Sequence, residues 1–387
     1  MKIGIYGGTF NPPHLGHVSA AMEALEQTKL GKLIVIPDTI PPHKEMPQGS
    51  PSEKDRLKMT RLAFSGCGKK VEVSDIEMQR EGKSYTVHTV DRLRQLYPRD
   101  EFVLFMGTDM FLSLESWFEF ERLIKSVTVG VFTRADGEDI QLTKAKEKYE
   151  KLYGAKVTIV KNTPIDISSS EIRSQLIIRG GGEFLSDKVY EYIIKNSLYG
   201  ARPNFDWLRV KGNRMLSFKR MPHVAGCERE AVRLARRWGA DENAAREAAI
   251  LHDCTKRLGL EEQLLLCNKY GIMTDAVEAV EGKLLHAKTG AAIAKYEYGL
   301  SDEVHDAIFW HTTGKPDMTM LEKVIYLADY IEPTRDFEGL EKLRALSYRD
   351  IDKALYLGLK MSIDDMNERG IIPHENSRKA MEWLAGK

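Results

Sequence analysis

Two histidines near the N-terminus stand three residues apart, at the end of the run Gly7-Gly8-Thr9-Phe10-Asn11-Pro12-Pro13-His14-Leu15-Gly16-His17. A strand-like stretch precedes the glycines, which we expect to let the backbone turn tightly and approach an anion. A helical pattern begins near His14, and a helix start offers unpaired N–H groups to phosphate. His14 and His17 then share one face of the first turn, and Gly16 leaves room for phosphate. Their imidazoles can stabilise the charge that builds on phosphate during phosphoryl or nucleotidyl transfer. A Gly-Gly pair without the rest of this run would indicate only a tight turn.

The second half of the chain carries histidines and aspartates of the kind that hold metal ions in helical proteins. The set comprises His223, His252, Asp253, His286, His311 and Asp329. Imidazole and carboxylate ligands on several helices can converge in a bundle core. A lone histidine in a helix is usually structural. Adjacent residues of a helix point in directions about 100 degrees apart, so only one of them normally faces a given site. The adjacent pair His252-Asp253 therefore indicates a shared metal that both side chains reach.

The elements that would position the first site alternate between strands and helices. Amphipathic helical patterns such as Glu53 to Phe64 and Tyr85 to Leu96 lie between the strand-like runs. The expected strands are Lys2 to Tyr6, Lys32 to Pro37, Val71 to Ile76, Phe102 to Met106, Val127 to Phe132 and Lys156 to Val160. This order predicts an α/β fold with a Rossmann-like, doubly wound parallel sheet, whose ligands bind beyond the carboxyl ends of the strands.

The alternation of strand-like and helical segments ends near residue 200, where Gly200 and Pro203 indicate a linker. Beyond it, apolar residues recur at spacings of three and four, which predicts an all-α bundle. The expected helices include Ala231 to Trp238, Asn243 to Leu251, Ala287 to Tyr298, Leu321 to Ile331 and Ile351 to Met361. We therefore expect one domain at 1–198, a linker at 199–206 and a second domain at 207–387.

The bulk composition limits the partners. Lys and Arg together number 57, as do Asp and Glu, so no net charge attracts nucleic acid or anionic membrane. The four cysteines form no CxxC pair, which indicates neither a zinc knuckle nor a disulfide framework. No apolar run approaches the roughly 18 residues of a membrane span. We expect a soluble, cytoplasmic protein whose partners are small nucleotides. A homo-oligomer is compatible with the sequence.

The run from Gly7 to His17 resembles the GGTFxPxHxGH motif of the HxGH nucleotidylyltransferases, and specifically nicotinate mononucleotide adenylyltransferases. Ile167-Ser168-Ser169-Ser170-Glu171-Ile172-Arg173 is similar to the ISSTxIR element, whose hydroxyls and arginine hold the ATP triphosphate; Ser170 replaces the usual threonine. Pro41-Pro42-His43-Lys44 resembles the PPHK loop, in which Lys44 would supply a positive charge to phosphate.

Two further segments resemble the same family, and all the segments together occur in the family's order over about 195 residues. Gly107-Thr108-Asp109 and Trp117 resemble the GxD…W segment, which implies that Asp109 binds a sugar or base edge and that Trp117 stacks on pyridine. Ser84-Tyr85-Thr86 resembles the segment that meets the nicotinate carboxylate, although His88 stands where the family has an acid.

The resemblance implies that AMP is transferred from ATP to nicotinate mononucleotide and that Mg²⁺ is held mostly by the nucleotide phosphates. His14 and His17 are the expected catalytic residues, and Gly7, Gly8, Thr9 and Phe10 are expected to contact the nucleotide. The alternative is another HxGH transferase, acting on phosphopantetheine or a cytidine nucleotide.

The ligand series of the second half resembles the HD phosphohydrolase superfamily. The surrounding segments, from Arg220-Met221-Pro222-His223 to Asp329-Tyr330-Ile331-Glu332-Pro333, look like the subfamily that cleaves diadenosine tetraphosphate into two ADP. This resemblance covers roughly residues 207 to 380. It implies that one metal is held by His223, His252, Asp253 and Asp329, with Asp253 bridging to a second metal on His286 and His311.

A metal pair about 3.5 to 4 Å apart activates a bridging water and clamps the entering and leaving oxygens. Imidazole and carboxylate ligands suit iron or manganese over magnesium. Lys256, expected to be catalytic, and Arg335 would neutralise phosphate, unless they are solvated surface charges. His305 and His374 lie outside the motif and are expected not to be ligands. The alternative is a nucleotide-sensing module that regulates the transferase.

Overall fold

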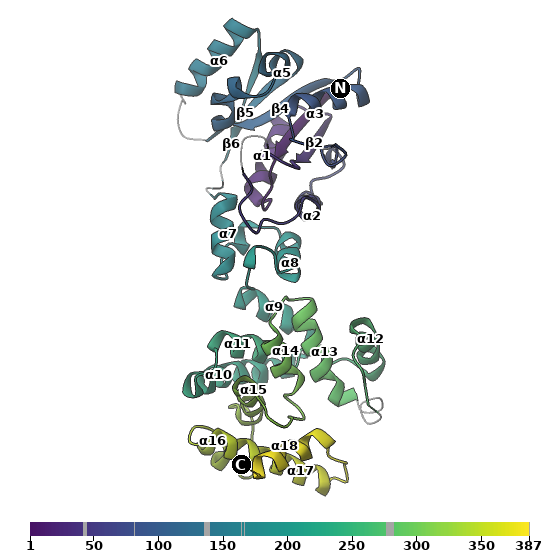
Figure 1. Ribbon diagram of the computed structural model, residues 1–387, viewed down its shortest axis with the longest axis vertical. Coiled ribbons are helices and arrows are strands. Elements are labelled where there is room, and N and C mark those ends of the chain that lie inside the picture. Colours follow the sequence, from purple (N-terminus) through teal and green to yellow (C-terminus); the bar gives the residue numbers. More distant parts are fainter. Residues whose placement is uncertain are drawn as a thin grey trace. The chain divides into compact units, whose positions relative to one another are not determined.

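The computed structural model describes residues 1–41, 45–80, 82–134, 140–163, 165, 167–275 and 282–386. The chain divides into two compact units, Met1–Ala201 and Arg202–Lys387. The first unit is built around a parallel sheet, and the second consists of helices (Figure 1). Both fold classes predicted from the sequence are therefore confirmed.

The sheet of the first unit has six strands in the order β3-β2-β1-β4-β5-β6, and every neighbouring pair is parallel. The strands are β1 (Lys2–Gly8), β2 (Lys32–Pro37), β3 (Val71–Val73), β4 (Glu101–Gly107), β5 (Thr128–Arg134) and β6 (Lys156–Asn162). The order reverses direction between β1 and β4. In doubly wound sheets, ligands bind at such a switch point, beyond the carboxyl ends of the strands.

Helices cover both faces of this sheet because its strands bury side chains on both sides. In β2, Leu33 and Val35 join the core that contains α1, whereas Ile34 and Ile36 join the core that contains α3 and α5. This alternation follows from the period of two in a strand. The helices are α1 (Leu15–Gln27), α2 (Glu53–Ala63), α3 (Thr86–Leu96), α4 (Thr108–Leu112), α5 (Phe120–Ser126), α6 (Ile140–Tyr153), α7 (Ser169–Ile177) and α8 (Asp187–Lys195).

The first strand runs further than the sequence indicated, and this corrects the role expected of its glycines. Gly7 and Gly8 are the last residues of β1 and pair with Ile36 and Pro37 of β2, so they do not form the turn. The turn comes at Phe10, which has a positive φ of 46°. The space beside Gly7 is open, since a Cβ built there would meet no atom within 4 Å.

The second unit consists of helices and turns, with no strand among its described residues. Its helices are α9 (Phe205–Met215), α10 (Met221–Trp238), α11 (Glu242–Leu251), α12 (Leu260–Tyr270), α13 (Gly282–Tyr296), α14 (Asp302–Phe309), α15 (Met320–Ile331), α16 (Leu340–Ser347), α17 (Ile351–Glu368) and α18 (Glu375–Ala385). One buried apolar cluster joins α10, α11, α13, α14 and α15. These five helices, or the turns directly after them, carry the histidines and aspartates of the second site.

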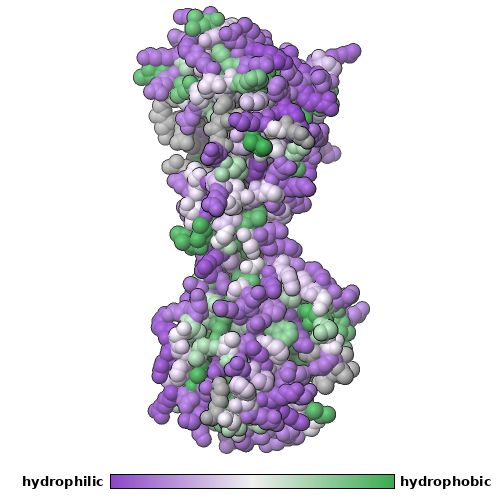
Figure 2. Space-filling model, in the orientation of Figure 1, coloured by the Kyte–Doolittle hydropathy of each residue, from purple (hydrophilic) through white to green (hydrophobic). Residues whose placement is uncertain are grey.

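The surface shown in Figure 2 is mostly hydrophilic, with hydrophobic residues in small scattered groups. Within the described ranges, no helix combines the length and the hydrophobicity needed to span a bilayer.

Candidate active sites

The two N-terminal histidines meet at the start of α1. His14 is the residue before the helix, and its ring centroid lies 3.7 Å from that of His17. The backbone N–H of His14 donates to Nδ1 of His17 at 3.1 Å. Because Nδ1 accepts this bond, neutral His17 carries its proton on Nε2, which is then a donor.

Both imidazoles are neutral at physiological pH. Burial lowers the pKa of His14 to about 4. Burial, followed by the proximity of His14, lowers the pKa of His17 well below its usual value. A Cβ on Gly16 would lie 3.0 Å from Nδ1 of His14, so this glycine makes room for the His14 ring. Neutral imidazoles in this position can donate hydrogen bonds, as the sequence indicated.

Two cavities open at the switch point of the sheet and share Tyr6, His17 and Gly107 in their walls. The larger, about 390 Å³, also contains His14 and Asp109. The smaller, about 240 Å³, is also lined by Ser84, Thr86 and Trp117. His17 therefore forms part of the wall of both cavities.

The segment before α3 sets the wall of the smaller cavity. Ser84 is buried, and its Oγ accepts a hydrogen bond from the backbone N–H of Thr39 at 3.1 Å. Tyr85 is the residue before α3, and its ring lies 4.5 Å from that of Phe118 between centroids. His88, which replaces the acid of the family pattern, also lies against Phe118, at 5.7 Å.

The serine-rich segment begins α7 and lies against the loop after β1. Ser168 caps the helix and exchanges hydrogen bonds with Glu171. Arg173 donates to the carbonyl of Asn11 at 2.7 Å and to Oγ of Ser170 at 2.9 Å. The segment thus packs beside the motif, although Ser168, Ser170 and Arg173 do not line either cavity.

Phe10 and Lys44 were both expected to contact the nucleotide. The Phe10 side chain is 2% exposed and packs in the core, edge-on to His17 at 5.1 Å. Its side chain therefore packs against His17 and helps to position it, and contact of Phe10 with the nucleotide stays a prediction. Lys44 lies outside the described residues.

Sequence reasoning missed Arg56, which is 2% exposed. Its guanidinium donates to the carbonyls of Thr9, Asp38 and Thr39, at 2.9, 2.6 and 2.9 Å. It therefore ties the loop after β1 to the loop after β2. An arginine in an amphipathic helix normally faces solvent, so nothing in its sequence context indicated this role.

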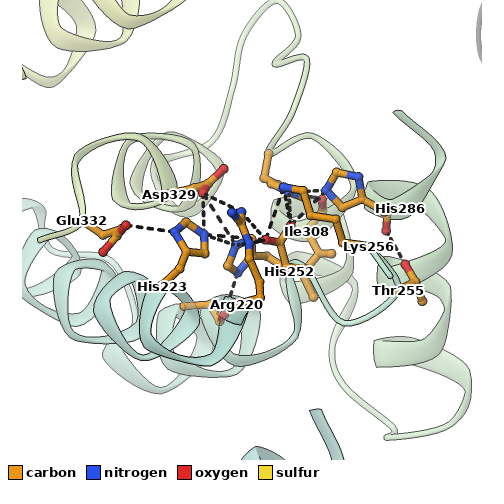
Figure 3. Close-up of polar contacts among 12 residues, drawn as sticks. Arg220, His223, His252, Thr255, Lys256, His286, Ile308, Asp329 and Glu332 are labelled. Carbon is orange, nitrogen blue, oxygen red and sulfur yellow. Dashed lines mark hydrogen bonds and ion pairs between the residues drawn. The ribbon is translucent and has the colours of Figure 1, made fainter. Parts of the chain in front are cut away.

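The six expected metal ligands of the second unit converge from five elements. His223 lies in the first turns of α10, His252 and Asp253 directly follow α11, His286 lies in α13, His311 follows α14, and Asp329 lies in α15. His252 and Asp253 are 0% exposed. Figure 3 shows His223, His252 and His286 in one connected set of polar contacts that also includes Asp329, Arg220 and Lys256.

Three of the imidazoles are fixed by hydrogen bonds at Nδ1. His252 donates to the carbonyl of Ala249 at 2.8 Å, and His311 donates to that of Ile308 at 2.6 Å. Nδ1 of His223 lies 2.9 Å from Oε1 of Glu332. With the proton at Nδ1, Nε2 of each neutral ring presents a lone pair.

These lone pairs face other nitrogens at short range. Nε2 of His223 lies 3.3 Å from Nε2 of His252, and Nε2 of His286 lies 3.2 Å from Nε2 of His311. In the first pair both nitrogens are acceptors, so a cation or proton must lie between them. Convergent imidazole nitrogens whose other ring nitrogen is hydrogen-bonded are the arrangement of a metal site.

Asp253 lies between the two histidine pairs. Its Oδ2 is 3.4 Å from Nε2 of His252 and 3.6 Å from Nε2 of His223, whereas its Oδ1 is 3.1 Å from Nε2 of His286. Asp329 completes the first side, with Oδ1 3.0 Å from Nε2 of His223. The geometry yields two candidate ligand groups, one of His223, His252 and Asp329 and one of His252, Asp253 and His311.

Both carboxylates stay ionised although they are buried. Burial opposes the charge of Asp253, but the electrostatic influence of the surrounding histidines, His252 first, outweighs it and holds the pKa of Asp253 well below the usual value. For Asp329, burial is likewise outweighed, chiefly by His223 and His252, and the pKa is again lowered. Burial lowers the pKa of His286 to about 4. Anionic carboxylates and a neutral imidazole form a donor set that fits a divalent metal.

Three cations surround this cluster. Arg220 forms an ion pair with Oδ2 of Asp253, Lys256 lies 3.0 Å from Oδ1 of Asp253, and Arg335 lies 2.7 Å from Oδ1 of Asp329. Lys256 and Arg335 thus contact the ligand carboxylates and are not isolated surface charges. The sequence did not indicate the contact of Arg220 with Asp253, although Arg220 lies only three residues before His223.

Glu332 was missed as well. It is 0% exposed, contacts His223, and accepts from both the N–H and the hydroxyl of Thr334. A Cβ at Gly226 of α10 would overlap Oε2 of Glu332. Gly226 therefore permits the close approach that brings Glu332 to His223.

A cavity of about 610 Å³ opens beside the cluster and is lined by His311, Asp329 and Arg335. Tyr326, Tyr330 and Phe337 form its aromatic wall. His305 pairs with Asp306 and His374 pairs with Asp275, none of which belongs to the cluster.

Comparisons with known proteins agree with this division. Residues 5–175 match the cytidylyltransferase-like family model, and residues 220–334 match the HD domain model. The probable nicotinate-nucleotide adenylyltransferase of Carboxydothermus hydrogenoformans is 39% identical over 199 residues, which cover 51% of this chain and 98% of that protein. That of Shouchella clausii is 39% identical over 203 residues, covering 51% and 97%.

A solved structure from Clostridium acetobutylicum, described as a predicted HD superfamily hydrolase involved in NAD metabolism, is 35% identical. It covers 48% of this chain and 99% of that chain, with a TM-score of 0.47.

Proposed function

Because the chain belongs, through its first unit, to the family of nicotinate-nucleotide adenylyltransferases, we propose that this unit transfers AMP from ATP to nicotinate mononucleotide. The position of His17 between two cavities is the observation that supports the proposal most directly. We assign ATP to the cavity with Asp109 and the pyridine nucleotide to the cavity with Trp117. The domain boundaries we propose are 1–198 and 207–387, joined by 199–206.

In the proposed reaction, an oxygen of the 5′-phosphate of nicotinate mononucleotide attacks the α-phosphorus of ATP. The bond from this phosphorus to the β-phosphate oxygen breaks, and pyrophosphate leaves with its electron pair. His17 donates from Nε2 to a non-bridging oxygen of the α-phosphate, where negative charge builds. Arg173 supplies positive charge at the start of α7, and Lys44 is proposed to do so from the loop after β2. Holding the two substrates in the correct relative orientation supplies the rest of the rate enhancement.

For the second unit, we propose hydrolysis of a phosphoanhydride, with diadenosine tetraphosphate as the substrate and two ADP as products. The convergence of imidazole lone pairs around Asp253 supports this proposal. The proposed ligands are His223, His252, Asp253, Asp329, His286 and His311. Two bound iron or manganese ions would polarise the phosphate and activate water.

The chain's own residues would orient that substrate. Arg335 and Lys256 can exchange their carboxylate contacts for phosphate oxygens when the metals neutralise Asp329 and Asp253. The aromatic wall of Tyr326 and Tyr330 offers a face for an adenine ring.

A substrate panel on the full chain tests both proposals. ATP is offered with nicotinate mononucleotide, nicotinamide mononucleotide or phosphopantetheine, and pyrophosphate release is measured. Turnover of phosphopantetheine alone would overturn the first proposal. Diadenosine tetraphosphate is offered with Fe²⁺, Mn²⁺ or Mg²⁺, and ADP is measured. Protein that is loaded with metal and binds this nucleotide without cleaving it would instead be a nucleotide sensor.

A further inference from the structure

The smaller cavity of the first unit contains two carboxyl groups that the proposed transfer does not use. Asp38 directly follows β2, and Glu77 lies in the turn after β3. Both line the cavity whose other walls include Ser84 and Trp117. Under the proposed function this cavity receives the pyridine ring, and the inference below rests on that function.

One carboxylate oxygen of Glu77 is an unused hydrogen-bond acceptor. Its side chain is 8% exposed, and Oε1 accepts from the hydroxyl of Thr89 at 2.7 Å. Oε2 is buried and has no hydrogen-bond partner among the residues that the structure describes. A buried carboxylate oxygen in this state is stabilised by a ligand that brings an N–H or O–H group.

Asp38 changes its charge near neutral pH. Burial raises its pKa to about 7, the negative charge of Glu77 adds to the rise, and Arg56 opposes it. Arg56 directs its N–H groups to backbone carbonyls, so it provides no direct bond to either carboxyl group.

The other ionisable groups of this cavity come from β1 and α1. Burial raises the pKa of Tyr6 far above its usual value, and burial lowers that of His17 well below it. Both are therefore neutral around pH 7, and their charge does not change there.

Nicotinate and nicotinamide mononucleotide differ only in the group on the pyridine ring. An ionised carboxyl repels the carboxylate of the acid but accepts hydrogen bonds from the NH₂ of the amide. We propose that Asp38, next to Glu77, determines the choice between the acid and amide substrates. When protonated it donates to the nicotinate carboxylate, and when ionised it favours the amide.

The test is the ratio of kcat/KM for the acid to kcat/KM for the amide, measured on the full chain from about pH 6 to about pH 8.5. Both substrates carry the same 5′-phosphate, so its ionisation cancels in the ratio. Because Asp38 loses its proton in this range, the ratio should fall about five- to tenfold as the pH rises. A ratio that stays constant in the unmodified protein would overturn the inference.

Three variants test whether Asp38 causes the pH dependence of this ratio. In Asp38→Asn the ratio should be independent of pH. In Glu77→Gln the midpoint should move to lower pH, since one source of the raised pKa of Asp38 is gone. Asp187→Asn removes an exposed carboxylate at the start of α8 and should behave like the unmodified protein. A fall that persists in Asp38→Asn would also contradict the inference. If neither pyridine nucleotide reacts at any pH, the proposed function itself fails.

Discussion

At the scale of residues, both sites use the main chain to decide which nitrogen of an imidazole carries the proton. The N–H of His14 occupies Nδ1 of His17 and leaves Nε2 as a donor. In the second unit, the carbonyls of Ala249 and Ile308 occupy Nδ1 of His252 and His311 and leave Nε2 as an acceptor. Nε2 of the imidazole is therefore a donor in the first unit, as our proposal for phosphate requires, and an acceptor in the second, as our proposal for metal requires.

Metal analysis of two histidine variants tests the second arrangement. His311→Ala removes a proposed ligand, so its metal content should fall from about two ions per chain to about one. His305→Ala changes a histidine of the same unit that pairs with Asp306, and it should retain both ions. Equal metal content in the two variants would contradict the assigned ligand set.

The sequence predicted which histidines and aspartates come together, but not what holds them. His14 and His17 could be paired from their spacing, and the adjacent His252 and Asp253 from their chemistry. Arg220 and Glu332 could not be assigned, because charged residues beside a motif are usually solvated. Their contacts depend on how the start of α10 packs against the turn after α11, which carries Asp253, and against the end of α15.

At the scale of elements, the strands of the sheet were predicted well and their ends less well. The predicted Lys32 to Pro37 is β2 as observed, whereas the predicted Val71 to Ile76 ends at Val73. This strand lies at the edge and pairs only with β2. The helix expected from Ala231 begins at Met221. The buried face of its first turns includes His223, Gly226 and Glu230, so the spacing of apolar residues did not indicate these turns.

The close approach of Glu332 to α10 gives an element-scale prediction. Gly226→Ala places a methyl group where Oε2 of Glu332 lies, so Glu332 must move away from His223. We expect metal affinity to weaken about 10- to 100-fold, as is typical when an outer partner of a ligand is lost. Metal titration measures this. Gly259→Ala, where a Cβ would make only an ordinary contact with Glu262, is the control, and equal affinities would refute the role of Gly226.

Arg56 gives a second prediction at this scale. Arg56→Ala leaves the carbonyls of Thr9, Asp38 and Thr39 without their donor. The free energy of unfolding of the first unit should fall by about 1 to 3 kcal/mol, and KM should rise for both substrates of transfer. Arg61→Ala, on the exposed side of α2, should change neither quantity in denaturation and kinetic assays. An unchanged KM in Arg56→Ala would show that the two loops hold their position without it.

At the scale of the whole molecule, each unit has its own core and its own site. The apolar clusters of Met1–Ala201 and of Arg202–Lys387 share no residue. With 57 acidic and 57 basic side chains, no net charge attracts phosphate, so we expect its binding to depend on local groups such as Arg173 and Arg335. The change from strand patterns to helical patterns predicted two fold classes, but no pattern in the sequence shows whether one site affects the other.

The central claim, two independent enzymes in one chain, is tested most directly by measuring both activities on three forms of the full protein. The unmodified chain should transfer adenylyl groups and hydrolyse diadenosine tetraphosphate. His17→Ala should lose transfer by about 100- to 1,000-fold and keep hydrolysis, and Asp253→Ala should lose hydrolysis and keep transfer. Loss of both activities in either variant would contradict the independence of the two sites.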